Sequence, residues 1–323
     1  MTSRAFLIVA ATAMIGASHD LLAQSTYPTK TIRLVVPNPP GGATDTVARL
    51  FAPALGKRLG QSLVVENRAG SNGNIAIELA ARAPADGYTV VLAADAQIVI
   101  SPHLYPTFPV DTLRDLVPIA SVATTFMMLT VNPAIPARTL SEFIEHARRA
   151  NPPLAYASIG SGSQHHLTME LFKQRAGIDM LHIPYKGGGP ATVAILAGDV
   201  AVMFGGNSTA GHIKAGKLRG LAVASARRSR ANPDLPTLGE FYSGLEATTW
   251  LALFAPAGTP EVPMNRLRDE IALVLNDPET RERFASAGGM EPFATTPAEL
   301  AALIKSDYAK YGAIVKAVGV KVD

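Results

Sequence analysis

Three times in this sequence, a short apolar strand leads into glycines and then into a helix. The three junctions are residues 34–45, 158–163 and 185–190. In the first of them, a strand ending near Pro37 is followed by Gly41-Gly42 and by a helix that we expect over residues 43–59. Strands that alternate with helices in this way form βαβ units, in which parallel strands are covered by helices on both faces. The sequence therefore predicts an α/β fold.

Each junction presents main-chain N–H groups to an anion. Glycine lets the backbone approach a ligand closely, and the positive end of the following helix points to the same place. For a single junction such as Gly41-Gly42, a tight turn between a strand and a helix is an equally good explanation. Three similar junctions in one chain favour a scaffold that brings them face to face around a small carboxylate.

The chain of 323 residues is long enough for two domains. Alternating strands and helices are expected up to residue 122, and the same alternation resumes after it. The apolar runs 116–122 and 127–131 are separated by Ala-Thr-Thr, where we place a crossing from one lobe to the other. After residue 236 the pattern changes to one strand at 248–255 and three helices, which are expected to pack mostly on the first lobe.

We therefore predict two lobes, each with a central, mostly parallel sheet. Residues 25–122 and 223–323 form the first lobe, and residues 123–222 form the second. The chain crosses twice between the lobes, and two crossings make a hinge.

Residues 1–24 are expected to be a secretory signal peptide rather than part of the fold. Arg4 provides a positive start, residues 5–17 are apolar, and the small residue Ala23 precedes the expected cleavage near Gln24. The apolar stretch is too short to span a membrane. The chain has no cysteine, so it has neither a disulfide nor a lipid-modified cysteine at the cleavage site. We expect an exported protein that is soluble in the periplasm.

The charge of the chain does not indicate nucleic-acid binding. The net charge is +3, and the basic residues are scattered along the sequence. A nucleic-acid-binding surface would need basic residues gathered in a stripe with aromatic residues among them. The mild basicity instead favours anionic ligands.

The best candidate for catalysis is Ser208. It lies in Gly-Asn-Ser-Thr-Ala at residues 206–210, between an expected strand and helix, where an α/β-hydrolase would have its nucleophile elbow. Such an enzyme needs an acid and then a His further along the chain. The one later His is His212, which leaves no room for the acid, so we predict that the protein is not an enzyme.

The sequence predicts neither a metal site nor a bound cofactor. His165 and His166 are neighbours on an expected helix and point apart, and no His-Glu-x-x-His occurs. Gly160-x-Gly162 begins a dinucleotide fingerprint, but His165 stands where its third glycine would be.

Seven short motifs follow one another in an order that is typical of one family. They are Tyr-Pro-Thr-Lys at 27–30, Pro-Gly-Gly followed by Asp at 40–45, Val-Glu-Asn-Arg at 65–68, Ser-Pro-His-Leu-Tyr at 101–105, Gly-Ser-Gly-Ser at 160–163 followed by His166-Leu167, His-Ile-Pro-Tyr-Lys-Gly at 182–187, and Ala-Pro-Ala-Gly-Thr-Pro at 255–260. With these motifs, the sequence from Tyr27 to the C-terminus resembles the Bug family, the receptors of tripartite tricarboxylate transporters. The resemblance implies a type II periplasmic binding protein whose two lobes close on a ligand.

The resemblance also implies that main-chain amides and water hold a ligand carboxylate at the junctions. Carried onto this sequence, with the neighbouring loops included, the candidate ligand-binding residues are Asn38, Gly41, Gly42, Thr44, Asp45, Ala94, Asp95, Ser158, Gly160, Ser161, Gly162, Ser163, Gln164, His165, Tyr185, Lys186, Gly187, Gly188 and Asn207. Asn38 stands where the family usually has an aromatic residue, and residues 93–97 replace a loop that is usually rich in hydroxyl groups. Both departures flank the expected cleft, so they bear on which carboxylate is bound. Tyr311 replaces a frequent Trp and is expected to matter for packing alone.

Two charged candidates each have two roles open to them. Asp45 can stabilise the start of the helix, or it can accept a hydrogen bond from a ligand hydroxyl or N–H group; its charge would repel a carboxylate placed beside it. Lys186 is the one cation in the three loops, and it can be either a surface residue or a residue that contacts the ligand.

Together, the residues and the resemblance predict a receptor that captures a small carboxylate and delivers it to a tripartite tricarboxylate transporter. The ligand is a di- or tricarboxylate, an aromatic acid or an acidic amino acid. The expected partners are this ligand and the membrane subunits of the transporter, and we expect the receptor to be a monomer. A receptor that feeds a sensor system and a secreted α/β-hydrolase that uses Ser208 are the alternatives.

Overall fold

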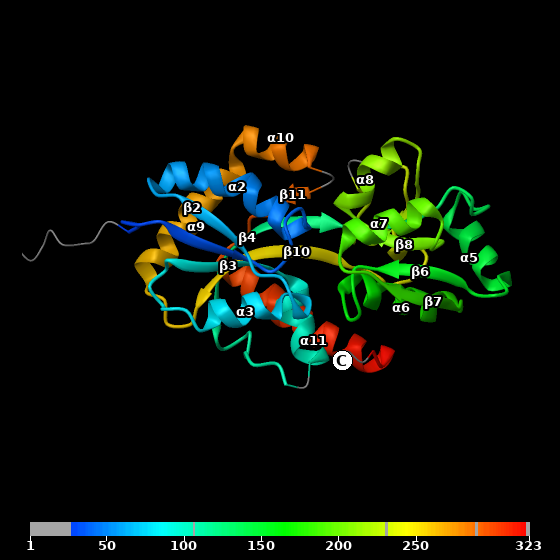
Figure 1. The fold of residues 1–323 in the computed structure, drawn as a ribbon, viewed down its shortest axis with the longest axis horizontal. Coiled ribbons are helices and arrows are strands. Elements are labelled where there is room, and N and C mark those ends of the chain that lie inside the picture. Colours follow the sequence, from blue (N-terminus) through cyan, green and yellow to red (C-terminus); the bar gives the residue numbers. More distant parts are fainter. Residues whose placement is uncertain (1–26, 106, 230–231, 288–289, 321–323) are drawn as a thin grey trace, which may run out of the picture.

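Two lobes lie side by side in the structure, each built around one β-sheet (Figure 1). The computed structural model describes residues 27–105, 107–229, 232–287 and 290–320. The predicted two-lobed α/β fold is confirmed. The predicted signal peptide, residues 1–24, lies outside the described residues.

The first lobe is built on a six-stranded sheet with the order β11-β4-β10-β3-β1-β2. Its strands are β1 (Ile32–Val36), β2 (Leu63–Asn67), β3 (Thr89–Ala94), β4 (Leu116–Phe126), β10 (Thr248–Pro256) and β11 (Met290–Pro292). Its helices are α2 (Ala43–Leu59), α3 (Asn74–Ala81), α4 (Ser101–Leu104), α9 (Glu261–Asn276), α10 (Pro278–Ser286) and α11 (Pro297–Val318), with the short helical turns η1 (Ser71–Gly73) and η2 (Ala96–Ile100). The N-terminal and C-terminal parts of the chain thus share one sheet.

Helices cover both faces of this sheet (Figure 1). On β1, Leu34 packs in the core that includes Phe51 of α2, whereas Val35 packs in a second core with Ile77 of α3. Because side chains of a strand alternate between its two faces, a strand that is covered on both sides is almost continuously apolar. This explains the apolar run that begins the first junction of the sequence.

The second lobe is built on a five-stranded sheet with the order β7-β6-β8-β5-β9. Its strands are β5 (Met128–Val131), β6 (Leu154–Ser158), β7 (Met180–Pro184), β8 (Val202–Gly205) and β9 (Arg219–Val223). Its helices are α5 (Leu140–Arg149), α6 (Gln164–Ala176), α7 (Gly188–Ala197) and α8 (Asn207–Lys214), and a short turn, η3 (Leu238–Glu240), follows β9. Its core is rich in large side chains such as Phe143, Phe172 and Phe204.

Both sheets are mixed, which corrects the predicted mostly parallel arrangement. In the first sheet, β1 pairs in parallel with β2 and β3, whereas β10 is antiparallel to β3 and β4, and β11 is antiparallel to β4. In the second sheet, β6 pairs in parallel with β7 and β8, whereas β5 is antiparallel to β8 and β9. Each of these antiparallel pairs includes at least one of the strands next to the two crossings, which are β4, β5, β9 and β10. Strands β4 and β5 carry the chain out of the first lobe, and strands β9 and β10 carry it back. The outgoing and returning strands therefore run in opposite directions.

The two passages between the sheets, at Met127 and just before Thr248, come later in the sequence than the predicted lobe limits at 122/123 and 222/223. Strand β4 continues through the predicted break and pairs with β10 as far as Phe126, opposite Thr248. Only Met127 separates it from β5 in the second sheet. On the return path, Leu238 and Leu245 still pack in the core of the second lobe. The exact domain limits remain predictions.

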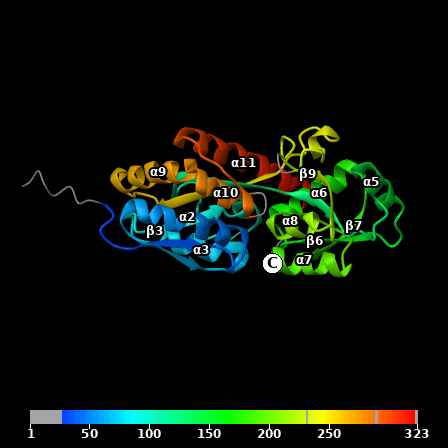
Figure 2. The ribbon, with the colours of Figure 1, turned by 90° about the horizontal axis from the view of Figure 1, so that it is seen from above.

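Helix α11 reaches from the first lobe to the second (Figure 2). Its residues Ile304 and Val315 share a core cluster with Leu167 of α6. The last helix of the chain therefore packs against both lobes, next to the crossing strand β10.

Candidate functional site

A cavity of about 320 Å³ lies between the lobes. The first lobe contributes residues 38–44, Asn72 and residues 94–97 to its wall, and the second lobe contributes Ile159, residues 163–165, residues 186–190, Met203, Phe204, Gly206 and Ser208. The crossing strands and their link contribute Thr125, Phe126, Met127, Thr249 and Leu251. A ligand in this cavity would touch both lobes and the strands that join them.

The first turns of four helices border this cavity. They belong to α2, α6, α7 and α8, whose N-terminal caps Gly42, Ser163, Gly187 and Gly206 all line it. The structure therefore brings the three predicted junctions together and adds a fourth, between β8 and α8. The first four N–H groups of a helix have no partner within it, and the helix dipole adds partial positive charge there. Such a cluster of helix N-termini favours an anion.

In the first junction, the two glycine amides are already occupied. The N–H of Gly41 donates to Oδ2 of Asp45 at 2.8 Å, and the N–H of Gly42 donates to the carbonyl of Pro39 at 3.0 Å. Gly41 has a φ of +82°, a left-handed conformation that glycine adopts without strain. Gly42 has no side chain that could cap the helix, so the amides of Ala43 and Thr44 in the first turn of α2 have no partner within the helix, and both residues line the cavity.

Asp45 holds this loop in shape. Its buried carboxylate accepts hydrogen bonds from Gly41, from Nε of Arg49 at 3.0 Å and from Nδ2 of Asn67 at 2.9 Å. Burial alone would raise the pKa of Asp45, but the hydrogen bonds from Arg49, Gly41 and Asn67 outweigh it and hold the pKa below its usual range. Of the two roles open to Asp45, the geometry favours stabilising the start of α2.

The second junction is held by its own side chains. Ser163 caps α6 by accepting a hydrogen bond from the N–H of His166, and its hydroxyl donates to the carbonyl of Gly160 at 2.7 Å. The N–H of Gly162 donates to Nδ1 of His166 at 3.0 Å. The loop before Ser163 is thus tied to the helix, and Ser163, Gln164 and His165 present the first turn of α6 to the cavity.

A stack of aromatic rings lies beneath this loop, and sequence reasoning missed it. The rings of His166 and His182 are parallel with centroids 3.8 Å apart, and Tyr156 stacks on His182 at 4.9 Å. Nε2 of His182 also lies 2.7 Å from the hydroxyl of Ser158. Burial, and then the neighbouring His182, lower the pKa of His166 to about 4. The pair is therefore neutral at neutral pH and acts as a support for the loop.

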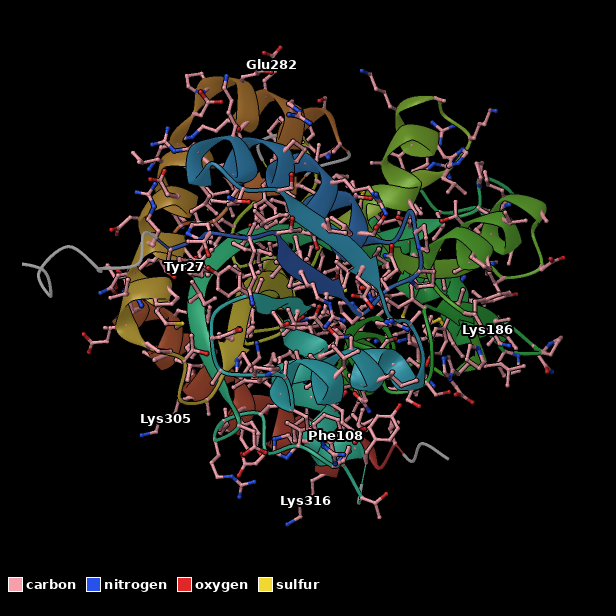
Figure 3. All side chains as sticks on the ribbon, turned by 60° about the vertical axis from the view of Figure 1, so that its left-hand side comes forward. Tyr27, Phe108, Lys186, Glu282, Lys305 and Lys316 are labelled. Atoms are coloured by element: carbon pink, nitrogen blue, oxygen red, sulfur yellow. The ribbon has the colours of Figure 1, made fainter. Side chains whose placement is uncertain are left out.

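The third junction offers backbone atoms with little side-chain cover. Gly187 caps α7 with a φ of +108° and without a side-chain hydrogen bond, and Gly188 and Gly189 follow it along the cavity wall. Lys186, labelled in Figure 3, is exposed and also borders the cavity. Its position is compatible with both of its predicted roles.

The structure separates the predicted ligand-binding residues into two groups. Those that line the cavity are Asn38, Gly41, Gly42, Thr44, Ala94, Asp95, Ser163, Gln164, His165, Lys186, Gly187 and Gly188. Those that are not among its described lining are Asp45, Ser158, Gly160, Ser161, Gly162 and Tyr185. Asn207 begins α8 between the lining residues Gly206 and Ser208, and nothing further is described of its side chain. Whether any of these residues binds a ligand remains a prediction.

The crossing strands supply lining residues that the sequence reasoning did not name. Thr125 and Thr249 are paired on β4 and β10, and Phe126, Met127 and Leu251 lie next to them. A signal for them was present in the sequence, because a cleft between two lobes must be closed at its base by the segments that cross between them. Gln97 was missed as well: its amide accepts from the N–H of Ala94 and donates to the carbonyl of Asn72.

The chain matches the model of a known family and several known proteins. The match to the "Tripartite tricarboxylate transporter family receptor" model covers residues 47–320. Protein BugT of Bordetella pertussis is 37% identical over 317 residues, which are 97% of this chain and 96% of BugT.

The chain belongs to the tripartite tricarboxylate transporter receptor family.

Solved structures of receptors with bound carboxylates share this fold. R. palustris Rpa4515 with adipate matches with a TM-score of 0.86 and 31% identity, over 91% of this chain and 99% of that one. MatC (Rpa3494) from Rhodopseudomonas palustris with bound malate matches with a TM-score of 0.80 and 28% identity, over 90% of this chain and 100% of that one. The predicted membership of the Bug receptors is confirmed.

Members of this receptor family are periplasmic binding proteins, and one of them, the periplasmic binding protein BugD, matches this chain with a TM-score of 0.83 and 31% identity over 91% of this chain and 99% of that one. In the part of the chain that the structure describes, no helix is both long and apolar enough to cross a membrane. The described residues also contain no group of three or more His, Cys, Asp or Glu side chains that could hold a metal ion.

Proposed function

We propose that this protein captures a small carboxylate between its lobes in the periplasm and delivers it to a tripartite tricarboxylate transporter. The observation that carries the proposal is the convergence of four helix N-termini, from both lobes, on one cavity. Main-chain donors and helix dipoles suit a negatively charged ligand without requiring a metal or a cofactor.

The expected strength of such a site is sufficient for a receptor. A hydrogen bond to a charged group contributes roughly 1.5–3 kcal/mol, and a helix N-terminus contributes roughly 0.3–1 kcal/mol. Association costs at least about 4 kcal/mol. Four or five charge-assisted hydrogen bonds would therefore leave about −8 kcal/mol, which corresponds to a micromolar dissociation constant.

The ligand class is supported by relatives. Two structurally similar proteins of the same fold are described with adipate and with malate. Both are dicarboxylates, and the cavity of this chain has helix N-termini on opposite sides, from α2 in the first lobe and from α6, α7 and α8 in the second. We therefore expect a di- or tricarboxylate, an aromatic acid or an acidic amino acid in this cavity.

The hydrolase alternative finds no support around Ser208. The hydroxyl of Ser208 accepts a hydrogen bond from Thr192 at 3.0 Å, and no described hydrogen bond joins Ser208 to a His. A nucleophilic serine needs a base within hydrogen-bonding reach. An esterase assay with Ser208→Ala as control would reveal a catalytic serine if activity were present in the wild type and lost in the variant.

The binding proposal is tested by thermal unfolding of the purified mature protein with adipate, malate, citrate, benzoate and glutamate. Adipamide, the neutral diamide of adipate, is the matched control. At least one carboxylate should raise the unfolding midpoint in a concentration-dependent way, because a ligand that binds the folded state stabilises it, and adipamide should not. If no carboxylate raises the midpoint, the proposed ligand class is wrong.

Delivery to a transporter is tested separately, by uptake of the labelled ligand in cells with and without the receptor. Loss of uptake in cells that lack the receptor supports the transport role. Unchanged uptake together with a lost transcriptional response to the ligand would instead indicate a receptor of a sensor system.

A further inference from the structure

Gln164 belongs to the second lobe, but its side chain is bonded to the first. It is the first residue of α6 and is buried. Its Nε2 donates to Oδ2 of Asp95 at 2.5 Å and to the hydroxyl oxygen of Tyr311 at 2.6 Å, with a longer contact to the carbonyl of Thr248 at 3.4 Å. Its Oε1 accepts from the hydroxyl of Thr249.

All of these partners belong to elements of the first lobe. Asp95 follows β3, Thr249 lies in the crossing strand β10, and Tyr311 lies in the last helix, α11. The amide of a Gln side chain has two N–H hydrogens and one carbonyl oxygen, and each has a partner here. The side chain is therefore fully used by the protein, and it has no N–H left for a ligand.

Gln164 also lines the cavity between the lobes. Gln164 begins α6, so its own N–H is one of the first-turn amides that have no partner within the helix. One residue thus lines the cavity at the start of α6 and holds the other lobe with its side chain.

We propose that Gln164 is a positioning residue whose side chain clamps the first turn of α6 to the first lobe and so couples ligand capture to lobe closure. The coupling to a ligand rests on the proposed function. The clamp consists of contacts within the chain, so it can be measured without a ligand.

The side chain of Gln164 lies in a buried socket next to several titratable groups. Asp95 is fully buried, and among the described residues its Oδ1 has no hydrogen-bond partner. Asp307, Lys310 and Tyr311 of α11 act on it electrostatically. Burial, and then the charge of Asp307, raise the pKa of Asp95 well above its usual range. The neutral, protonated acid is the form that suits this socket.

The direction of the pH effect follows from this shift. An opening of the lobes that exposed Asp95 to water would bring its pKa back towards the usual value, so the closed state would take up a proton relative to the open state. The clamp is therefore strongest below the usual pKa of an Asp and weakens as the pH rises through the raised pKa of the closed state. Asp95→Asn imitates the protonated acid and removes this dependence.

The chain carries a natural reporter beside the clamp. Trp250 is its one Trp, it follows Thr249 directly, and it is buried. Its Nε1 donates to Oδ2 of Asp307 at 2.8 Å. A change in the packing or the charge of the socket should therefore alter the fluorescence of this residue.

The test uses the ligand-free mature protein and measures hydrogen exchange of its main-chain amides together with Trp250 fluorescence. Gln164→Met keeps the volume of the side chain but removes its hydrogen bonds, and Gln164→Ala removes both. Both variants should speed exchange at the start of α6 and around Thr249 in β10 by about tenfold or more, the factor that 1.4 kcal/mol represents. Gln174→Ala, on the exposed side of the same helix, is the matched control and should exchange like the wild type.

Asp95→Asn should retain wild-type protection, and its Trp250 fluorescence should lose the pH dependence that the wild type shows. Wild-type exchange in the folded Gln164→Met variant would overturn the proposal, as would identical pH profiles in wild type and Asp95→Asn. A thermal-shift assay with adipate on the same samples separates the two proposals. Adipate could fail to stabilise wild type and variants while hydrogen exchange in the Gln164 variants still speeds up as expected. In that case the proposal that adipate binds is wrong, and the proposal of the Gln164 clamp is supported.

Discussion

The carboxylate of Asp45 stabilises the loop that carries the first glycine junction. Three donors, from Gly41, Arg49 and Asn67, meet on its buried carboxylate. Asp45→Ala would leave the amide of Gly41 without its acceptor. We expect the free energy of unfolding to fall by about 1–3 kcal/mol, and the affinity for a carboxylate to fall with it because the first turn of α2 is no longer held in place. Urea denaturation and calorimetry measure the two effects.

The control for this prediction is Asp179→Ala, since the side chain of Asp179 is 84% exposed. It should change neither quantity measurably. An Asp45→Ala protein with wild-type affinity would show that the loop does not need this carboxylate.

His166 makes the stability of the protein depend on pH in the acid range. In its neutral form, Nδ1 accepts from the N–H of Gly162 and the ring stacks on His182. Its pKa is about 4 in the folded protein, mainly because of burial, and about 6.5 in an unfolded chain. The depressed pKa means that its contribution is fully present above about pH 6.5 and is lost as the pH falls towards 4. The pKa difference between about 6.5 and about 4, at about 1.4 kcal/mol per pH unit, corresponds to about 3–4 kcal/mol of stability.

Urea denaturation at about pH 7, 5.5 and 4 checks this, with His166→Gln as the comparison. Gln also offers an acceptor to Gly162 but does not titrate, so its stability should depend less on pH. Equal slopes of stability against pH in the two proteins would exclude His166 as the cause.

At the scale of elements, helix caps near the cavity and far from it should have different consequences. Ser163 caps α6 beside the cavity, and Thr296 caps α11 far along the chain, where it forms a capping box with Glu299. Substituting either cap by Ala should lower the free energy of unfolding by about 1 kcal/mol. Only Ser163→Ala should also weaken carboxylate binding, because the first turn of α6 borders the cavity.

Matched thermal unfolding and calorimetry on the two variants measure these effects. The prediction is wrong if Thr296→Ala weakens binding as much as Ser163→Ala does. The pair thus separates a general loss of stability from a loss of alignment of the first turn of α6.

For the whole molecule, the cavity between the lobes predicts compaction on ligand binding. Both lobes contribute to its wall, and the two passages between the sheets, at Met127 and just before Thr248, are short. A ligand that contacts both lobes stabilises the arrangement in which they are closest. We expect small-angle scattering to show a smaller radius of gyration at saturating adipate, and no change with adipamide. Superimposable profiles for protein that calorimetry shows to be saturated would rule out hinge closure.

Much of the local structure was predictable because its causes are local. The predicted helix at 43–59 coincides with α2, which begins after Gly42 and ends before Gly60. Apolar spacing and capping act over a few residues, so a sequence reveals them directly. The helix N-termini at the cavity were predictable for the same reason.

The tertiary structure decided which residues and strands these local elements pair with. Tyr311 was expected to matter for packing alone, yet its hydroxyl accepts a hydrogen bond from Gln164, 147 residues away in the sequence. Likewise, the extension of β4 to Phe126 depends on its pairing with β10, which lies more than a hundred residues later. The sequence by itself determined where strands end and helices begin, because those preferences belong to the backbone nearby. Only the folded chain determined which charges are satisfied and which amides face the cavity, because hydrogen bonding and burial depend on residues brought together from distant parts of the chain.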